Sequence, residues 1–92
     1  MQVSHTVRLQ GVQQYEMEHF TFMLSYEDMP EALRTECSLV QIFRIMEFVV
    51  QRELINLQLQ SGHMTLDVGK MKIEYLRQCL GDLSEKLAPH GL

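Results

Sequence analysis

The stretch PEALRTECSLVQIFRIMEFVVQRELINLQLQSG, from Pro30 to Gly62, decides the fold, because it predicts one long helix with two apolar faces. Proline suits the first turn of a helix, and glycine suits the left-handed position just past its end. Neither residue occurs between them, so we predict a helix over about 31–61. At about 1.5 Å per residue it would be roughly 45 Å long, whereas a compact chain of this length has a radius of gyration of about 12 Å. The helix would therefore extend beyond a globular monomer.

The C-terminal third of the chain predicts a second helix, over about 66–88. Its leucines and Ile73 recur at a four–three spacing, Thr65 can cap its start, and Pro89 ends it. The short connection 61–65 is of the length that joins antiparallel helices. Gly69 and Gly81 interrupt the pattern, and each is either a flaw or a point of close approach. A flanking line of apolar side chains follows the same helix: Val68, Met71, Tyr75 and Cys79.

At 100° per residue, the apolar side chains of the long helix form a broad arc and a second, narrower stripe. We predict that the broad arc and the four–three positions of the last helix form the core or dimer seam. The members of this seam are Leu39, Ile42, Phe43, Met46, Val49, Val50, Leu57, Ile73, Leu76, Leu80, Leu83 and Leu87. The second stripe is predicted to bind a partner, and its members are Arg44, Phe48, Arg52, Ile55 and Leu59. A second stripe requires a second surface to cover it, from another segment of this chain, a second copy or a different protein.

The N-terminal third gives a weaker pattern. Val12, Tyr15, His19 and Tyr26 recur at helical spacing, which predicts a shorter helix over about 12–27. The alternation in 18–22 leaves a strand as the alternative. Residues 1–11 alternate in part, but with no second strand evident we predict a flexible or extended arm. The expected fold is therefore all-α, a single domain of three helices over residues 1–92, and an elongated homodimer.

Composition narrows the classes of function. The net charge of −4 leaves no basic stripe for phosphates, so we expect no nucleic-acid partner. No apolar run is long enough to span a membrane, and the first residues lack a secretory signal, so we expect a cytoplasmic protein without a membrane partner. Two cysteines are too few for a disulfide scaffold. Cys37 and Cys79 are predicted to be buried small hydrophobes.

The sequence offers little for catalysis. Glu16 and His19 have the spacing of one di-iron ligand pair, but no second copy of that motif occurs. The histidines and cysteines lack metal-ligand spacing, and no phosphate loop or nucleophile elbow is present. We therefore expect no enzyme activity, no cofactor, no metal and no small-molecule substrate.

The remaining hypothesis is protein binding. We expect a small dimeric regulator that binds and masks a surface of a partner protein, as an anti-activator or inhibitor of a transcription factor does. One alternative is a secretion or assembly chaperone that shields a helical client. A third is a self-assembling structural subunit. The sequence leaves open which apolar face serves self-association and whether the N-terminal segment swaps between subunits.

Overall fold

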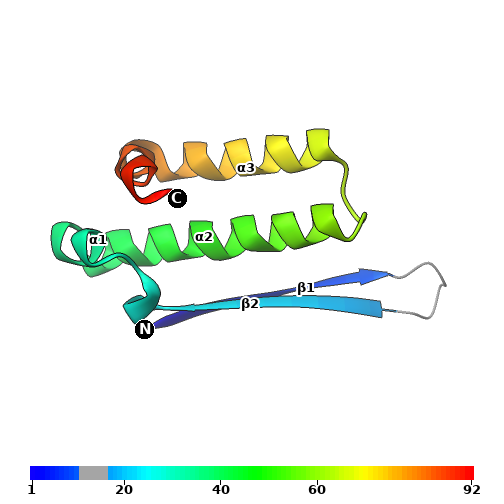
Figure 1. The fold of residues 1–92 in the computed structure, drawn as a ribbon, viewed down its shortest axis with the longest axis horizontal. Helices are drawn as coiled ribbons and strands as arrows, with labels where there is room; N and C mark the ends of the chain where they lie inside the picture. Colours follow the sequence, from blue (N-terminus) through cyan, green and yellow to red (C-terminus); the bar gives the residue numbers. More distant parts are fainter. Residues whose placement is uncertain (11–16) are drawn as a thin grey trace.

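The computed structural model describes residues 1–10 and 17–92 and arranges them in three layers (Figure 1). A hairpin of β1 (Gln2–Gln10) and β2 (Met17–Ser25) forms the first layer, α2 (Leu39–Gln60) the second, and α3 (Leu66–Leu80) the third. A 3-10 turn (Tyr26–Asp28) and the short α1 (Glu31–Glu36) connect β2 to α2, and two further 3-10 turns (Gly81–Lys86 and Ala88–His90) follow α3. The molecule is elongated, with extents of 47 × 26 × 18 Å.

The prediction of an all-α fold is wrong, because residues 17–25 of the predicted helix 12–27 form the strand β2 and its last two residues belong to the 3-10 turn. β2 pairs antiparallel with β1, so the predicted arm is a strand as well, and the fold is mixed α/β. The register places Phe20 opposite Val7 and Phe22 opposite His5, all on the side of the sheet that faces α2. The outer face carries polar side chains such as Thr6 and Thr21, whose hydroxyls lie 2.8 Å apart. Positions 12–16 of the predicted helix lie outside the described residues.

The predicted helix over 31–61 is divided into α1 and α2, with the break at Cys37 and Ser38. Ser38 caps α2: its hydroxyl accepts a hydrogen bond from the Gln41 backbone N–H at 3.2 Å. The Gln41 side chain in turn accepts from the Ser38 N–H at 2.9 Å. This reciprocal capping box starts a new helix without any Gly or Pro. The predicted single helix is therefore corrected to two.

The helical hairpin of α2 and α3 is present, but α3 is shorter than the predicted 66–88. It ends at Leu80 because Gly81 adopts a positive φ of 59°, which an L side chain rarely does. The chain then turns back toward α2 in 3-10 turns. Gly69 is a point of close approach, because a Cβ on it would lie 2.8 Å from the side chain of Leu59. None of the helices in the described residues is long and apolar enough to cross a membrane.

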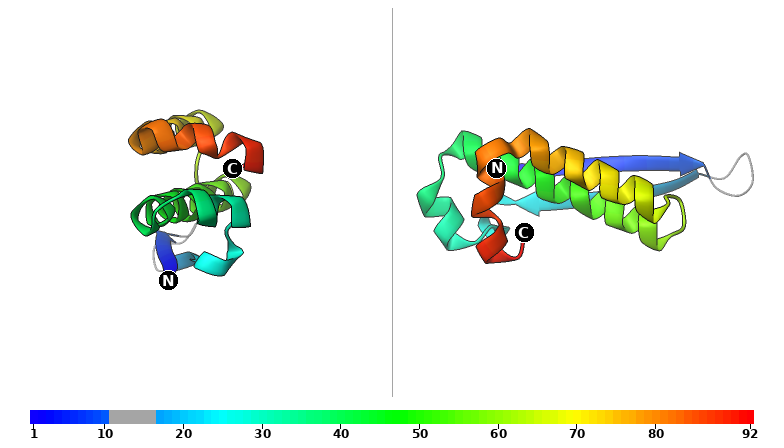
Figure 2. Two further views of the ribbon diagram at one scale, coloured as in Figure 1. Left: turned by 90° about the vertical axis from the view of Figure 1, so that its left-hand side faces the viewer. Right: turned by 90° about the horizontal axis from the view of Figure 1, so that it is seen from above.

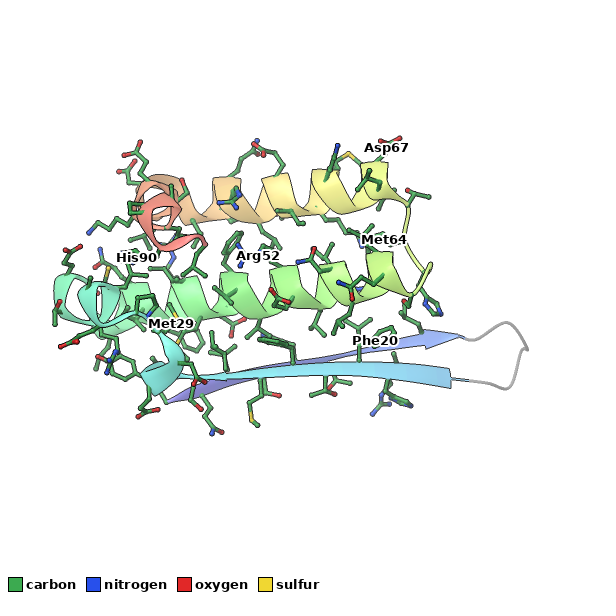
Figure 3. The ribbon with its side chains drawn as sticks, in the orientation of Figure 1. Phe20, Met29, Arg52, Met64, Asp67 and His90 are labelled. Atoms are coloured by element: carbon green, nitrogen blue, oxygen red, sulfur yellow. The ribbon has the colours of Figure 1, made fainter. Side chains whose placement is uncertain are left out.

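α2 is the middle layer and is buried on opposite sides, by the hairpin and by α3 (Figure 1). This arrangement explains its two apolar faces within one chain. The fully buried side chains come from α2, from α1 and from the turns after α3. They are Leu33, Ile42, Ile45, Met46, Val50, Leu54 and Leu87. Val7, Phe20, Phe22 and Leu24 of the sheet pack against this core, and Phe20 points toward α2 (Figure 3).

The strand geometry of β2 can be tested with two adjacent residues. Phe22 packs against the core, whereas Met23 is 58% exposed on the outer face. We expect Phe22→Ser to lower the free energy of unfolding by about 2 kcal/mol and Met23→Ser by no more than about 0.5 kcal/mol. Urea titration followed by circular dichroism measures both. Equal losses would contradict the strand, because adjacent residues of a strand point to opposite faces of the sheet.

Candidate functional site

The two flanks of α2 differ in how they are covered. On the flank nearer β2, α1 and the turns after α3 close the space, and Leu33, Leu83 and Leu87 are buried there. The guanidinium groups of Arg52 and Arg77 both donate to the main-chain oxygen of Leu92, which ties the last residues to α2 and α3. Figure 2 shows these C-terminal turns on the opposite side of α2 from β1. The flank on the β1 side has no such cover from the described residues.

A groove of about 600 Å³ opens on this uncovered flank. Its walls come from all three layers: Val7 of β1 on one side, α2 as the floor, and α3 on the other side. The lining is mostly apolar. It consists of Val7, Gln51, Leu54, Ile55, Gln58, Met71, Lys72, Tyr75 and Leu76. The groove is therefore a cleft between the edge of a sheet and a helix, with another helix at its base.

Apolar side chains extend the groove onto the surface of α3. Met71 is 68% exposed and Tyr75 is 66% exposed, although each is large and largely apolar. Val68 and Cys79 are also exposed and lie on the same helical stripe as Tyr75, seven before it and four after it. A contiguous exposed apolar surface of this kind marks an interaction site more often than single scattered hydrophobes do.

The groove is bordered by a strand edge with free hydrogen-bonding capacity. Among the described residues, β1 pairs with β2 alone, so one edge of its main chain is not paired with another strand. Val7 lines the groove, and the His5 ring nitrogen Nε2 lies 2.6 Å from the Glu47 carboxylate of α2, which places β1 on the groove side. Unpaired edges present main-chain N–H and C=O groups that can pair with another strand.

Polar groups in the groove are few and are not arranged for chemistry. Lys72 is the one charged residue of its lining, and Gln51 and Gln58 are the other polar ones. Gln58 donates from Nε2 to the Leu54 carbonyl at 3.2 Å. Within residues 1–10 and 17–92, no group of three or more His, Cys, Asp or Glu side chains is placed to hold a metal ion. Glu16, half of the spacing motif noted above, lies outside the described residues.

The predicted partner-binding residues lie on the side of α2 that faces α3; Phe48 and Ile55 are buried, Arg52 and Leu59 are half-buried, and Arg44 is exposed. Phe48 is 3% exposed, with the guanidinium carbons of Arg52 and Arg77 at 5.3 and 5.2 Å from its ring centre. Arg44 donates to the Cys79 carbonyl at 2.8 Å. Leu59 packs on Gly69, and Ile55, though buried, also lines the groove. Ile55 is thus the one member of this set that the structure places at the groove.

Arg52 lies in the space between α2 and α3 (Figure 3). Its pKa is lowered from the ordinary value, mainly because burial disfavours the charged guanidinium. The carboxylate of Glu53 opposes this effect, and the positive charge of Arg77 adds to it. The cation–π contacts with Phe48 and the shared acceptor on Leu92 offset part of the cost.

The predicted seam residues are distributed over several interfaces within the chain. Seven of them are buried, in α2, at the end of α3 and in the turns that follow it. They are Ile42, Met46, Val49, Val50, Leu80, Leu83 and Leu87. Leu57, Ile73 and Leu76 are partly buried, and Leu76 lines the groove. Leu39 and Phe43 are exposed near the start of α2. Of the two cysteines, Cys37 is buried as predicted, but Cys79 is exposed, so its predicted burial is wrong.

Sequence reasoning missed the main groove residues. Met71 and Tyr75 belong to the flanking apolar line of the last helix. That line was a signal for an exposed apolar surface, but the sequence pattern did not distinguish it from the core positions. Val7 could not be placed, because an arm has no fixed position relative to a helix. Comparison of the chain with models of protein families, with curated proteins and with solved structures finds no match. The function must therefore be inferred from the geometry of the groove.

The exposure of apolar surface at the groove can be measured with the dye anilinonaphthalene sulfonate, whose fluorescence rises on such surface. We expect Tyr75→Lys to reduce the dye fluorescence by more than half without changing the free energy of unfolding, because Tyr75 is exposed. Leu66→Lys is the matched control, since Leu66 is also on α3 and 60% exposed but does not line the groove. Equal loss of dye signal in both variants would show that the groove is not the dye site.

Proposed function

We propose that this protein is a non-enzymatic binding module that accepts an extended strand of a partner protein along the free edge of β1, with the strand's side chains in the groove. The observation that supports this proposal most directly is the juxtaposition of an unpaired strand edge with an apolar cleft. In β-strand addition, main-chain hydrogen bonds provide affinity, and pockets for alternate side chains provide specificity. The edge of β1 would provide the first and the groove the second.

The lining of the groove defines the chemistry of the partner strand. Side chains that point toward α2 would meet Val7, Leu54, Ile55 and Leu76, so alternate positions of the strand should be aliphatic or aromatic. Lys72 at the side of the groove favours a carboxylate on the strand near it. Tyr75 and Met71 would close over the outer side, and tyrosine is among the residues that dominate binding energies at interfaces.

A module of this kind acts by masking. The captured segment is removed from its other interactions, which inhibits a partner that needs the segment for its own assembly or ligand binding. This is the role of a small anti-activator or inhibitor, and it requires no bond-breaking chemistry from the module. We place the protein in the cytoplasm as part of the same proposal, because both Cys37 and Cys79 are free thiols.

The experiment is a selection from a display library of random twelve-residue peptides on the immobilised protein. We expect the enriched peptides to share apolar residues at alternate positions, with an acidic residue among them, because the groove meets one face of a strand. Apolar residues at a spacing of three and four would instead indicate a helical ligand. That result, or no enrichment, would overturn the proposal.

The site of binding is tested with one selected peptide and fluorescence anisotropy. We expect Tyr75→Lys to raise the Kd by at least about tenfold, whereas Leu66→Lys leaves it unchanged. Two further versions of the peptide carry N-methyl groups, one on its odd-numbered residues and the other on its even-numbered residues. Only one of the two should bind, because only one of these sets of N–H groups faces β1. Equal affinity of both versions would contradict strand addition.

A further inference from the structure

We infer that the strand that pairs with the free edge of β1 is β1 of a second copy of this chain, so that two hairpins form one continuous four-stranded antiparallel sheet in the order β2–β1–β1–β2. This inference rests on the proposed function, because it names the strand that the edge of β1 accepts. β1 has nine residues, so its edge is about 30 Å long. A strand that pairs antiparallel with its own copy obeys a twofold axis, which closes the assembly at two chains.

The spacing of the layers suits this dimer. α2 packs against both strands of its own hairpin, so it lies over a sheet that is two strands wide. Strands are spaced about 4.8 Å apart, so β1–β1 pairing would place the two α2 helices about 10 Å from each other. Helices in contact are separated by 8–10 Å. The α2 helices of the two copies would therefore be in contact when the strands pair, without an empty space between them and without a steric clash.

The side chains of β1 are compatible with pairing to themselves. In the register that overlaps the whole strand, Thr6 lies opposite Thr6 of the second copy, and Ser4 lies opposite Arg8. Val3, Val7 and Leu9 face α2, and so does His5, which would lie opposite Val7 of the second copy. The inner face would therefore be apolar across the junction apart from His5 of each copy, which is held by Glu47 of its own α2. Arg8 is the one residue of β1 with a permanent charge, and in this register it meets a serine. No like charges are brought opposite each other, which would weaken the pairing.

The groove walls also complement each other about this axis. Thr6 lies between His5, which contacts Glu47, and Val7, which lines the groove with Gln51. The axis would therefore pass close to Gln51. Two contacts show which residues of α3 lie beside which residues of α2: Gly69 lies beside Leu59, and Arg77 lies beside Phe48. Interpolation between these two contacts puts Tyr75 beside Gln51, and therefore near the axis.

Charges agree with the same symmetry. The contacts that place Tyr75 near the axis place Lys72 about level with Ile55, on one side of Gln51. Glu47 lies on the other side, four residues before Gln51 in α2. A twofold axis near Gln51 would bring Lys72 of each copy level with Glu47 of the other. Both charged side chains lie on the uncovered flank, where Glu47 also contacts His5 of its own chain, so the dimer would bring opposite charges to the junction at two equivalent places.

The mass of the protein in solution is the first test. We expect sedimentation equilibrium over a concentration series to show a closed transition from 10.8 kDa to about twice that mass. A mass of 10.8 kDa up to millimolar concentration would overturn the dimer. So would a mass that continues to grow with concentration, because a twofold dimer is closed.

The interface is located by cross-linking in a Cys79→Ser background, which removes the exposed native thiol. Thr6→Cys should form an intermolecular disulfide on mild oxidation, because its copy would lie directly opposite, within the 4.4–6.8 Å between Cα atoms that a disulfide requires. Thr21→Cys is the matched control, because Thr21 of β2 is paired with Thr6 and its side chain lies on the same outer face of the sheet. Its copy would be three strand spacings, about 14 Å, away. Equal cross-linking of both variants would overturn the β1 interface even if the protein is a dimer.

Failure of this inference is distinguishable from failure of the proposed function. A monomer that still binds the selected peptides would overturn the dimer and leave strand binding by the groove in place. A monomer that binds no strand peptide would overturn both. A dimer that the selected peptides dissociate, with cross-linking at Thr6 and little at Thr21, would support both, because the two ligands would compete for one edge.

Discussion

The burial of α2 on two opposite faces is the constraint on which the rest of the structure depends. A two-stranded hairpin is at best marginally stable alone, and a helix of fifteen residues such as α3 is marginal in water. Each of these layers is held by an apolar face of α2, with Val50 and Leu54 fully buried at its centre. The apolar inner face of the hairpin packs on one side of α2, and the apolar seam of α3 packs on the other side. Without α2, neither outer layer has a partner.

A stack of three layers with one helix in the middle has two flanks, and residues 1–10 and 17–92 close only one of them. α1 and the turns after α3 fill the flank nearer β2, and the arginines Arg52 and Arg77 fix Leu92 beside them. The described residues supply no equivalent segment on the β1 side. The groove results from this asymmetry, because the sheet edge and α3 stand apart there with apolar side chains exposed between them.

Stability and binding are carried by different parts of the molecule. The stripe of α2 that carries Phe48 packs on α3, where Phe48 lies against two guanidinium groups and is excluded from solvent. On the α3 side, the groove is lined by Met71 and Tyr75, which are exposed and contribute little to the core. Substitutions at Met71 and Tyr75 can therefore change association without unfolding the chain, whereas substitutions at Phe48 remove core packing. This separation makes the proposed binding surface accessible to mutational analysis.

Local signals account for the helical part of the fold. The apolar arc and the second stripe of the long helix predicted that two surfaces cover it, and the regular spacing after Thr65 predicted the antiparallel helix. The ends of the helices were also encoded: Ser38 and Gln41 have the spacing of a capping box, and Gly81 is the residue type that tolerates the positive φ at the end of α3. These features depend on contacts within four residues, so a single sequence contains them.

What only the tertiary structure decided is the identity of the surfaces on either side of α2. Residues 17–25 carry both a helical spacing and the alternation of Phe20, Phe22 and Leu24. The choice between them depends on the partner strand β1, whose paired residues lie 7 to 23 positions away in the sequence. Once β1 and β2 pair, the hairpin covers one face of α2 and α3 the other. The groove depends on the same pairing, since Val7 and the edge of β1 form one of its walls. The sequence by itself determined that α2 needs two covers. The long-range pairing of β1 with β2 decided that this chain supplies both and that, among the residues the structure describes, one flank stays open.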